Sequence, residues 1–362
     1  MKKRVVVAMS GGVDSSTAAW FLKEKGYEVI GATMCIGMLD KTQGGPARCC
    51  GLADIEDARR VALQLEIPFY VFQLREEFEK EVIQYFCEEY VNGKTPNPCI
   101  LCNEKIKFGS FLKKALELEA DFIATGHYAR LDFDERIGRF LLKKGLDRGK
   151  DQSYVLFSIT QDQFRHTLFP LGELRKDEVR KRALQSGLRV HDKPESQEVC
   201  FIHDTSYHSF LSERLKESIE PGPILDKDGN VLGKHKGIPF YTIGQRRGLC
   251  LAKGIPLYVI GIDREKNAII VGGEEEVYSD TFIVNSANWI VPQKMMVSSH
   301  PTQVKIRYNH AGSEASIFSK GEGELKVKFK SPQKAITPGQ AAVFYDGETV
   351  LGGGWIKEVL RS

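Results

Sequence analysis

Residues 8–16 combine the side chains and the backbone freedom that phosphate binding requires. The segment reads Ala-Met-Ser-Gly-Gly-Val-Asp-Ser-Ser, follows the apolar run Val5–Val7 and precedes a helix-like pattern. In a parallel α/β sheet such a loop lies at the carboxyl edge, where ligands bind. Gly11 and Gly12 let the backbone approach an anion, and the N–H groups at the helix start favour negative charge. The carboxylate of Asp14 suits a magnesium ion that bridges phosphates.

This loop is not a Walker A sequence, because the pattern G-x-x-x-x-G-K-[ST] does not occur in the chain. The hydroxyl groups of Ser10, Ser15 and Ser16 add further donors for an anion. A plain strand–turn–helix joint is the alternative interpretation, in which the glycines serve only the turn. The glycines, carboxylate and serines together, directly after a buried strand, favour a nucleotide-phosphate site over that alternative.

Three cysteines form the second group of reactive side chains. Cys99 and Cys102 lie in the segment TPNPCILCN at 95–103, and Cys200 ends the segment KPESQEVC at 193–200. The prolines precede a helix-like pattern, so Cys102 is expected near a helix N-terminus, where the dipole lowers the pKa of a thiol. A C-x-x-C pair is compatible with half of a zinc site, with a redox pair or with coincidence.

A structural zinc site needs four ligands, and the neighbouring Cys49 and Cys50 are the candidates for the other two. The eight cysteines of the chain do not indicate a disulfide framework, because the chain is long and has no secretion signal. The apolar stretch after Lys2-Lys3-Arg4 covers only five residues, whereas a signal peptide needs roughly 7–15. We therefore expect a cytoplasmic location and no membrane partner.

The elements that must position these residues alternate between strand-like and helix-like patterns in the first half of the chain. This alternation predicts a mostly parallel, Rossmann-like sheet with helices on both faces. The amphipathic stripe of 54–65, for example, places apolar residues at helical spacing. Strands are expected at 4–9, 28–34, 69–74 and 121–125, and helices at 15–25, 54–65, 76–91 and 104–118.

The last third of the chain follows a different period. Residues 303–308, 323–329 and 341–345 alternate in period two between Gly- and Pro-containing turns, which predicts a small antiparallel β-barrel. Lysines occupy every outward position between 326 and 330, which indicates a solvated sheet face or an RNA-facing surface. The stretch 205–275 is rich in Gly and Pro, with short strands at 257–262 and 268–271.

Length and composition agree with two or three ordinary globular domains. The chain has 362 residues, of which 42% are hydrophobic and 27% charged, and its formal net charge of +3 is too small to indicate nucleic acid on its own. The predicted class is α/β. We divide the chain into an ATP-binding catalytic domain at 1–204, a small central domain at 205–278 and a C-terminal β-barrel-like, tRNA-contacting domain at 279–362.

Six motifs in one order resemble the tRNA-specific 2-thiouridylase family of the ATP pyrophosphatase (PP-loop) superfamily. Together they run from the phosphate loop to the second half of the chain, which makes them far more specific than any single motif. They are the loop at 8–16, TPNPxxxCN with KIKFG at 95–109, ATGHYAR at 124–130, KDQSY at 150–154, KPESQEVCFI at 193–202 and YTIGQRRGL at 241–249.

The resemblance implies that ATP, with Mg²⁺, adenylates the 2-carbonyl oxygen of the wobble uridine of tRNA and that pyrophosphate is released. Adenylation is necessary because oxide is a very poor leaving group, whereas AMP leaves readily. The ATP-binding residues that match the motifs are Ala8, Met9, Ser10, Gly11, Gly12, Val13, Asp14, Ser15, Met34 and Gly126.

The resemblance also assigns the thiols. Cys200 would carry sulfur as a persulfide received from a sulfur-donor protein, and the terminal sulfur would attack the activated carbon. Cys102 would then attack the Cys200 sulfur, which forms a disulfide and leaves sulfur on the base. Asn97, Pro98 and Cys99 would line the target base.

Position 99 departs from part of the family, because some members have aspartate there as a candidate general base. With Cys99, the three catalytic candidates Cys99, Cys102 and Cys200 match the ligands for three irons of a [4Fe–4S] cluster, with one iron open for sulfide. The sequence therefore leaves a persulfide mechanism and a cluster mechanism both open.

A folded tRNA is held largely through its phosphates and its shape, and a target base must leave the stack to reach an active site. His127 alone is equally compatible with a buried structural histidine, and the basic stretch 175–187 favours a solvated face over an RNA patch. The residues that match tRNA-contacting motifs are His127, Lys150, Asp151, Gln152, Arg307, Tyr308 and Gln340.

Two alternatives remain on the sequence. Another PP-loop ATP pyrophosphatase that modifies tRNA or a nucleotide would share the phosphate loop, but amidating enzymes and lysidine-forming ligases need neither Cys102 nor Cys200. A non-catalytic, zinc-binding RNA module would use the C-terminal β region. Both leave the ordered motif set unexplained, so the thiouridylase interpretation is favoured.

Overall fold

The structure is a computed structural model, and it describes residues 2–37, 52–193, 199–202, 207–216, 219–251, 255–292 and 302–360. The zinc candidates Cys49 and Cys50 and the motif residues 194–198 lie outside the described residues. In the part that is described, no helix is long and apolar enough to cross a membrane.

Five parallel strands form the sheet of the N-terminal half, in the order β3-β2-β1-β4-β7. Val5 and Val7 of β1 pack on one face with α1, α2 and α8, and Val6 packs on the other face. This burial on both faces confirms the predicted Rossmann-like sheet. The elements are β1 (Arg4–Ala8), α1 (Val13–Glu24), β2 (Glu28–Cys35), α2 (Leu52–Gln64), β3 (Phe69–Gln73), β4 (Phe122–Ala124), α7 (Gln161–Arg165), β7 (Thr167–Leu168) and α8 (Lys176–Gln185).

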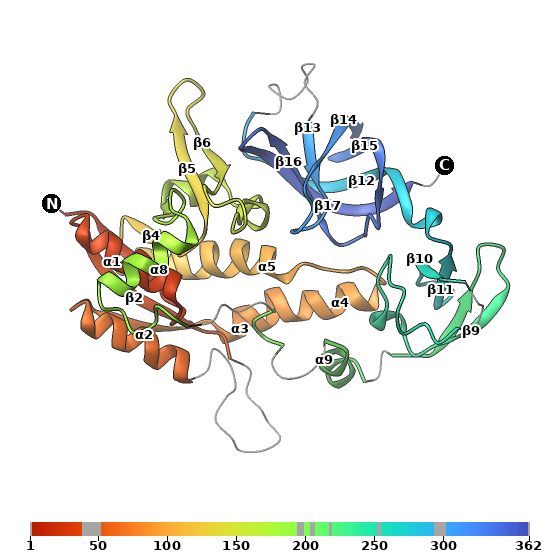
Figure 1. Cartoon of the computed structure of the whole chain (residues 1–362), viewed down its shortest axis with the longest axis horizontal. Helices are drawn as coiled ribbons and strands as arrows, with labels where there is room; N and C mark the ends of the chain where they lie inside the picture. The colour runs from red at the N-terminus through yellow and green to blue at the C-terminus, as the bar shows by residue number, and fades with distance from the viewer. Residues whose placement is uncertain are drawn as a thin grey trace.

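Two long helical segments cover the second face of this sheet and extend below the barrel (Figure 1). The second segment begins at Pro98, six residues before the predicted start, because proline is compatible with the first turn of a helix. Both segments contain a wider π-helical stretch. Their parts are α3 (Arg75–Phe78), η1 (Glu79–Gln84) and α4 (Tyr85–Val91), then α5 (Pro98–Leu101), η2 (Cys102–Ser110) and α6 (Phe111–Glu117).

The C-terminal region is an antiparallel barrel, as predicted, because β12 pairs with both β15 and β17. Its centre is filled by apolar side chains such as Phe282, Val327 and Phe344. The hairpin β5–β6 of the N-terminal half extends the barrel sheet through β17, which the sequence did not predict. The strands are β5 (Ala129–Asp134), β6 (Arg139–Lys144), β12 (Tyr278–Trp289), β13 (Thr302–Lys305), β14 (Ser313–Gly321), β15 (Glu324–Lys334), β16 (Ala341–Asp346) and β17 (Thr349–Leu360).

A four-stranded sheet in the order β10-β11-β8-β9 lies between these two parts along the chain. Its apolar side chains, including Ile224, Val259 and Ile269, form a separate small core. The predicted strands at 257–262 and 268–271 correspond to β10 and β11. The remaining elements are η3 (Ser153–Leu156), α9 (Tyr207–Arg214), β8 (Gly222–Leu225), β9 (Val231–His235), η4 (Ile238–Phe240), β10 (Tyr258–Asp263), β11 (Ala268–Gly272) and η5 (Glu275–Val277).

Candidate active site

The phosphate loop is held in shape by its own hydroxyl groups. The Ser10 N–H donates to the Ser15 hydroxyl oxygen (3.1 Å), and the Ser15 and Ser16 hydroxyls donate to the Gly12 carbonyl (3.2 and 2.9 Å). Gly11 has a φ of +71°, and a Cβ there would lie 2.3 Å from the Asp54 carbonyl oxygen. The turn therefore requires glycine at position 11. The hydroxyl groups of Ser15 and Ser16 form hydrogen bonds within the loop itself.

Gly126 follows β4 and packs directly on the start of α1. A Cβ at this position would lie 2.9 Å from the Asp14 Cβ and 2.9 Å from the Ser15 backbone nitrogen. Met34, the other ATP-binding candidate outside the loop, lies near the carboxyl end of the adjacent strand β2. The structure thus brings the loop, Met34 and Gly126 to the carboxyl edge of three neighbouring strands.

Gly126→Ala should weaken ATP binding, because the added methyl group has to displace the Asp14–Ser15 backbone. We expect the Kd for ATP to rise by about tenfold or more, measured by isothermal titration. Gly273→Ala is the matched control, since the closest atom to a Cβ there is Glu276 Oε2 at 3.7 Å. An unchanged Kd in Gly126→Ala would remove this residue from the ATP site.

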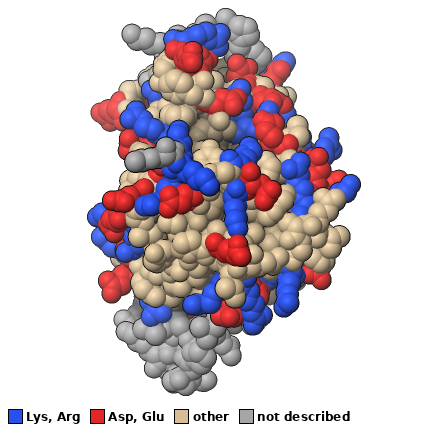
Figure 2. Space-filling model, turned by 90° about the vertical axis from the view of Figure 1, so that its left-hand side faces the viewer, with Lys and Arg blue, Asp and Glu red and all other residues tan. Residues whose placement is uncertain are grey.

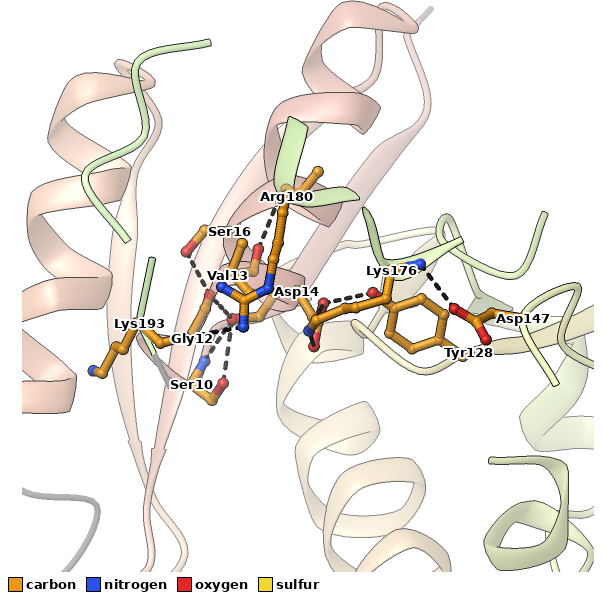
Figure 3. Close-up of polar contacts among 12 residues, drawn as sticks. Ser10, Gly12, Val13, Asp14, Ser16, Tyr128, Asp147, Lys176, Arg180 and Lys193 are labelled. Carbon is orange, nitrogen blue, oxygen red and sulfur yellow. Dashed lines mark hydrogen bonds and ion pairs between the residues drawn. The ribbon is translucent and has the colours of Figure 1, made fainter. Parts of the chain in front are cut away.

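Asp14 has two strong partners in this structure (Figure 3). Lys176 Nζ lies 2.7 Å from both carboxylate oxygens, and the Tyr128 hydroxyl donates to Oδ1 at 2.7 Å. Lys176 is buried at the start of α8. The prediction of a merely solvated face for 175–187 is therefore wrong at this position, where the lysine points inward to the phosphate loop.

A second lysine contacts the loop from the other side. Lys193 Nζ donates to the Gly11 carbonyl (3.2 Å) and pairs with Asp54 (2.7 Å) and Asp57 (2.9 Å). Burial lowers the pKa of Lys193, but its hydrogen bonds to the two aspartates outweigh burial and raise this pKa overall. Arg180 donates to the backbone carbonyl oxygen of Lys193 (3.3 Å) and of His191 (2.8 Å), so α8 fixes this segment to the loop.

Charges of both signs are interspersed on the face at this end of the molecule (Figure 2). A cleft of about 780 Å³ opens beside the loop, between α2 and residues 187–193. It is lined by Arg60, Leu63 and Arg189 among others, and by the ion-paired Lys193 and Asp57. Both lysines at the loop are thus paired with carboxylates.

The helical segment that carries Cys99 and Cys102, formed by α5, η2 and α6 and called the cysteine helix below, begins with a side-chain cap. The Asn97 Oδ1 accepts a hydrogen bond from the Cys99 N–H (3.1 Å), and Pro98 occupies the first helical position. Cys99, not Cys102, therefore lies in the first turn, which corrects the sequence expectation. Cys102 lies one turn further along and is buried.

Burial also reverses the predicted direction of the shift in the Cys102 pKa. Desolvation raises the pKa of Cys102, and it raises the pKa of Cys99, whose side chain reaches solvent on one side but is otherwise surrounded by protein. The positive charge of Lys107 lowers both pKa values without cancelling the effect of burial. Lys107 is thus a positive charge that favours the thiolate form of both cysteines.

The π-helical stretch η2 explains how Lys107 reaches the thiols. Residues five apart point about 140° away from each other in an α-helix, whereas a π-turn links residue i to residue i+5 and brings them to one side. Cys102 and Lys107 have this spacing at the start of η2. Among the described residues, Lys107 has no carboxylate within ion-pair distance, and sequence reasoning did not single it out.

His127 follows Gly126 in the chain and contacts the helix that carries Cys99 and Cys102. Its ring lies 6.0 Å from the Phe108 ring of η2 and 6.1 Å from the Phe169 ring, and its Nδ1 lies 2.7 Å from the Thr125 hydroxyl. Burial, and secondarily the Lys107 charge, lower the pKa of His127 well below its ordinary value. The imidazole is therefore neutral and enclosed, as in the structural interpretation.

Cys200 lies at the surface, two residues after the motif residues 194–198, which are outside the described ranges. The next residue, Phe201, is buried against the rings of Phe86 (5.3 Å) and Phe210 (5.4 Å). This anchors the end of the motif on α4 and α9. Within the described ranges, no three His, Cys, Asp or Glu side chains converge as metal ligands, so Cys200 does not meet Cys99 and Cys102 in this conformation.

The predicted tRNA-contacting residues occupy two places. In the 150–152 segment, Asp151 accepts from the Ser153 N–H (3.1 Å), and the Gln152 Oε1 accepts from the Tyr128 N–H (3.0 Å). This ties the segment to Tyr128 and hence to Asp14. Lys150 lies at the start of the same segment and is half-buried.

The barrel supplies the other candidates. Arg307 donates to the Lys334 carbonyl (3.0 Å) at the surface. The ring of the exposed Tyr308 meets the buried Tyr154 ring edge-on at 6.2 Å. The Gln340 side chain is hydrogen-bonded within the protein, since its amide donates to the Thr95 carbonyl (2.7 Å).

Family models match three consecutive parts of the chain. They are described as a tRNA methyl transferase HUP domain over residues 3–204, a tRNA methyl transferase PRC-barrel domain over 208–273 and an aminomethyltransferase beta-barrel domain over 279–356.

Full-length relatives carry a more specific name. The chain is 54% identical to the tRNA-specific 2-thiouridylase MnmA of Halothermothrix orenii, over 98% of this chain and 99% of the relative. It is 51% identical to the enzyme of the same name from Desulforamulus reducens, over 100% of this chain and 99% of the relative. The corresponding protein of Clostridium acetobutylicum is 49% identical over 99% of this chain and 100% of its own length.

Proposed function

The chain belongs to the tRNA-specific 2-thiouridylase family, and from this premise we propose how its residues convert uridine to 2-thiouridine in tRNA with ATP. One observation carries the proposal. The segment after β4 touches the phosphate loop through Gly126 and the cysteine helix through His127. Activation by ATP and attack by sulfur can therefore occur on one bound base. We also propose that the chain is divided into three domains, at 1–204, 205–278 and 279–362.

Adenylation uses the carboxyl edge of the sheet. The loop at 8–15, with Met34 and Gly126, binds ATP so that the 2-carbonyl oxygen of the wobble uridine attacks the α-phosphorus and pyrophosphate leaves. Lys176 and Lys193 exchange their aspartate partners for phosphate oxygens during this step. Asp14, once released from Lys176, is then available to a magnesium ion that accompanies ATP.

Sulfur transfer uses two thiols. A persulfide on Cys200, whose outer sulfur is transferred from the persulfide of a sulfur-donor protein, attacks C2 of the adenylated uridine, and AMP leaves with the former carbonyl oxygen. The Cys102 thiolate then attacks the Cys200 sulfur. This bond formation breaks the S–S bond to the base, leaves sulfur on C2 and oxidises the two cysteines to a disulfide, which an external thiol reduces before the next turnover.

Lys107 and Cys99 complete the thiol site in this scheme. The Lys107 ammonium stabilises the thiolate forms of Cys99 and Cys102 in surroundings that otherwise disfavour charge. Asn97, Pro98 and Cys99 contact the target base, which leaves the anticodon stack to enter the site. Lys150–Gln152, Arg307 and Tyr308 face the bound tRNA, and a tRNA substrate implies a cytoplasmic reaction.

The three thiols Cys99, Cys102 and Cys200 have the donor chemistry of an iron–sulfur site. In the described conformation, however, they do not converge on one point. We therefore derive no step through a [4Fe–4S] cluster, and its presence is an outcome of the experiment that follows.

The testing experiment combines anaerobically purified protein, unmodified tRNA, Mg²⁺–ATP and either sulfide or a persulfide donor, with nucleoside mass spectrometry as readout. ATP-dependent appearance of 2-thiouridine is expected. Iron and acid-labile sulfide are assayed on the same sample, and chelation of iron should leave the persulfide-driven reaction intact. Absence of thiolated nucleoside with both sulfur sources would assign the chain to another ATP-driven modification of tRNA or a nucleotide.

A further inference from the structure

Thr95 begins the target loop, defined here as residues 95–99, and two distant parts of the chain hold it in place. Its N–H donates to the Pro338 carbonyl (2.9 Å), and its carbonyl accepts from the Gln340 side-chain amide (2.7 Å). Its hydroxyl donates to the Thr242 hydroxyl (3.1 Å) in the 241–249 motif. One residue thus has its N–H, carbonyl and hydroxyl bonded to the barrel and to the central region.

The barrel loop that holds Thr95 is itself fixed. The Gly339 N–H donates to the Ile356 carbonyl (2.9 Å), and the Ile356 N–H donates to the Gln340 carbonyl (2.8 Å), so the loop is bonded to β17. Gly339 has a φ of +89°, and a Cβ there would lie 2.9 Å from the Lys94 Cβ and 3.0 Å from the Thr95 nitrogen. The two backbones are in direct contact, and the barrel loop acts as a rigid support.

The target loop transmits the position of Thr95 to the thiols. Pro96 and Pro98 fix two of its φ angles near −65°, and Asn97 caps the helix by accepting from the Cys99 N–H (3.1 Å). Little rotational freedom remains between Thr95 and Cys99. A shift of the Thr95 carbonyl therefore moves the start of the cysteine helix instead of being absorbed in the loop.

We propose that Gln340 is a positioning residue for thiolation: its amide, with the Pro338 carbonyl, clamps Thr95 and so sets the target loop against the activated base. This rests on the proposed function of the site. It differs from the direct tRNA contact expected from the sequence, because the side-chain amide donates a hydrogen bond to the Thr95 carbonyl in the absence of RNA.

Gln340→Ala and Gln340→Glu test the clamp, since a carboxylate at neutral pH accepts hydrogen bonds but cannot donate to a carbonyl. We expect kcat for thiolation to fall by about 10- to 100-fold, while the Kd for tRNA stays within about twofold. In the free proteins, hydrogen exchange of the amides in 95–103 should accelerate by at least about fivefold. Gln303→Ala, which changes an exposed barrel glutamine on β13, should match the wild type in all three measurements.

Thr242→Val and Thr242→Ser separate the two sides of the clamp, because only serine keeps the hydroxyl that Thr95 contacts. The serine variant should restore the exchange rates that valine perturbs. A large rise in the tRNA Kd of Gln340→Ala with unchanged exchange at 95–103 would overturn the clamp and assign Gln340 to RNA binding. If the wild type formed no 2-thiouridine, the proposed function would fail, yet the exchange comparison in free protein would still decide whether Gln340 holds the loop.

Discussion

Cys200→Ala should release pyrophosphate from ATP in the presence of tRNA but form no 2-thiouridine. The substitution removes the exposed thiol that we propose carries the sulfur, and it leaves the phosphate loop, with its Ser10, Ser15 and Gly12 contacts, untouched. We expect multi-turnover thiolation to fall by at least about 1,000-fold. The measurement pairs nucleoside mass spectrometry with a pyrophosphate assay on the same reactions.

Cys102→Ala should differ from Cys200→Ala in what accumulates. Without the second thiol, sulfur bound to C2 remains linked to Cys200, so a covalent protein–tRNA adduct that dithiothreitol cleaves should collect. Cys250→Ala is the control, because this exposed thiol belongs to none of the six motifs. Full multi-turnover activity in Cys102→Ala would refute the two-thiol scheme, and equal loss of pyrophosphate release in Cys200→Ala would show that the thiol serves activation instead.

The sequence predicted those parts of the site that are local in the chain. The phosphate loop depends on spacing within a few residues, and it follows from the freedom of glycine to adopt backbone conformations that other residues avoid. The parallel sheet followed from the alternation of buried strands and amphipathic helices. These features needed no knowledge of the tertiary contacts.

Several of the missed features depend on residues far apart in the sequence. Lys176 meets Asp14 across 162 positions and Lys193 meets Asp54 across 139, and no pattern in either segment names its partner. The hairpin β5–β6 joins the barrel through the β6–β17 pair, which local alternation cannot reveal. The thiol pKa was predicted in the wrong direction because the helix dipole is visible in a sequence, whereas the depth of burial is not.

Lys107→Met should slow thiolation by about 100-fold at neutral pH and move the rising limb of the pH–rate profile to higher pH. Lys107 lowers the pKa of Cys99 and Cys102 against the opposing effect of burial. Its loss therefore raises both pKa values further, and less thiolate is present at any pH below them. The measurement is single-turnover thiolation as a function of pH, together with the alkylation rate of Cys99 by iodoacetamide in the free protein.

Lys105→Met is the matched control, because it removes the same charge two residues earlier in the same helix. Lys105 is exposed and pairs with Glu104 (2.7 Å), so its loss leaves the surroundings of the thiols unchanged and should preserve the wild-type pH profile. Lys107→Arg keeps a positive charge and should recover most of the wild-type alkylation rate. An unshifted profile in Lys107→Met would mean that burial alone sets the thiol pKa values, and the thiolate needed for sulfur transfer would then have to form only after tRNA has closed the site.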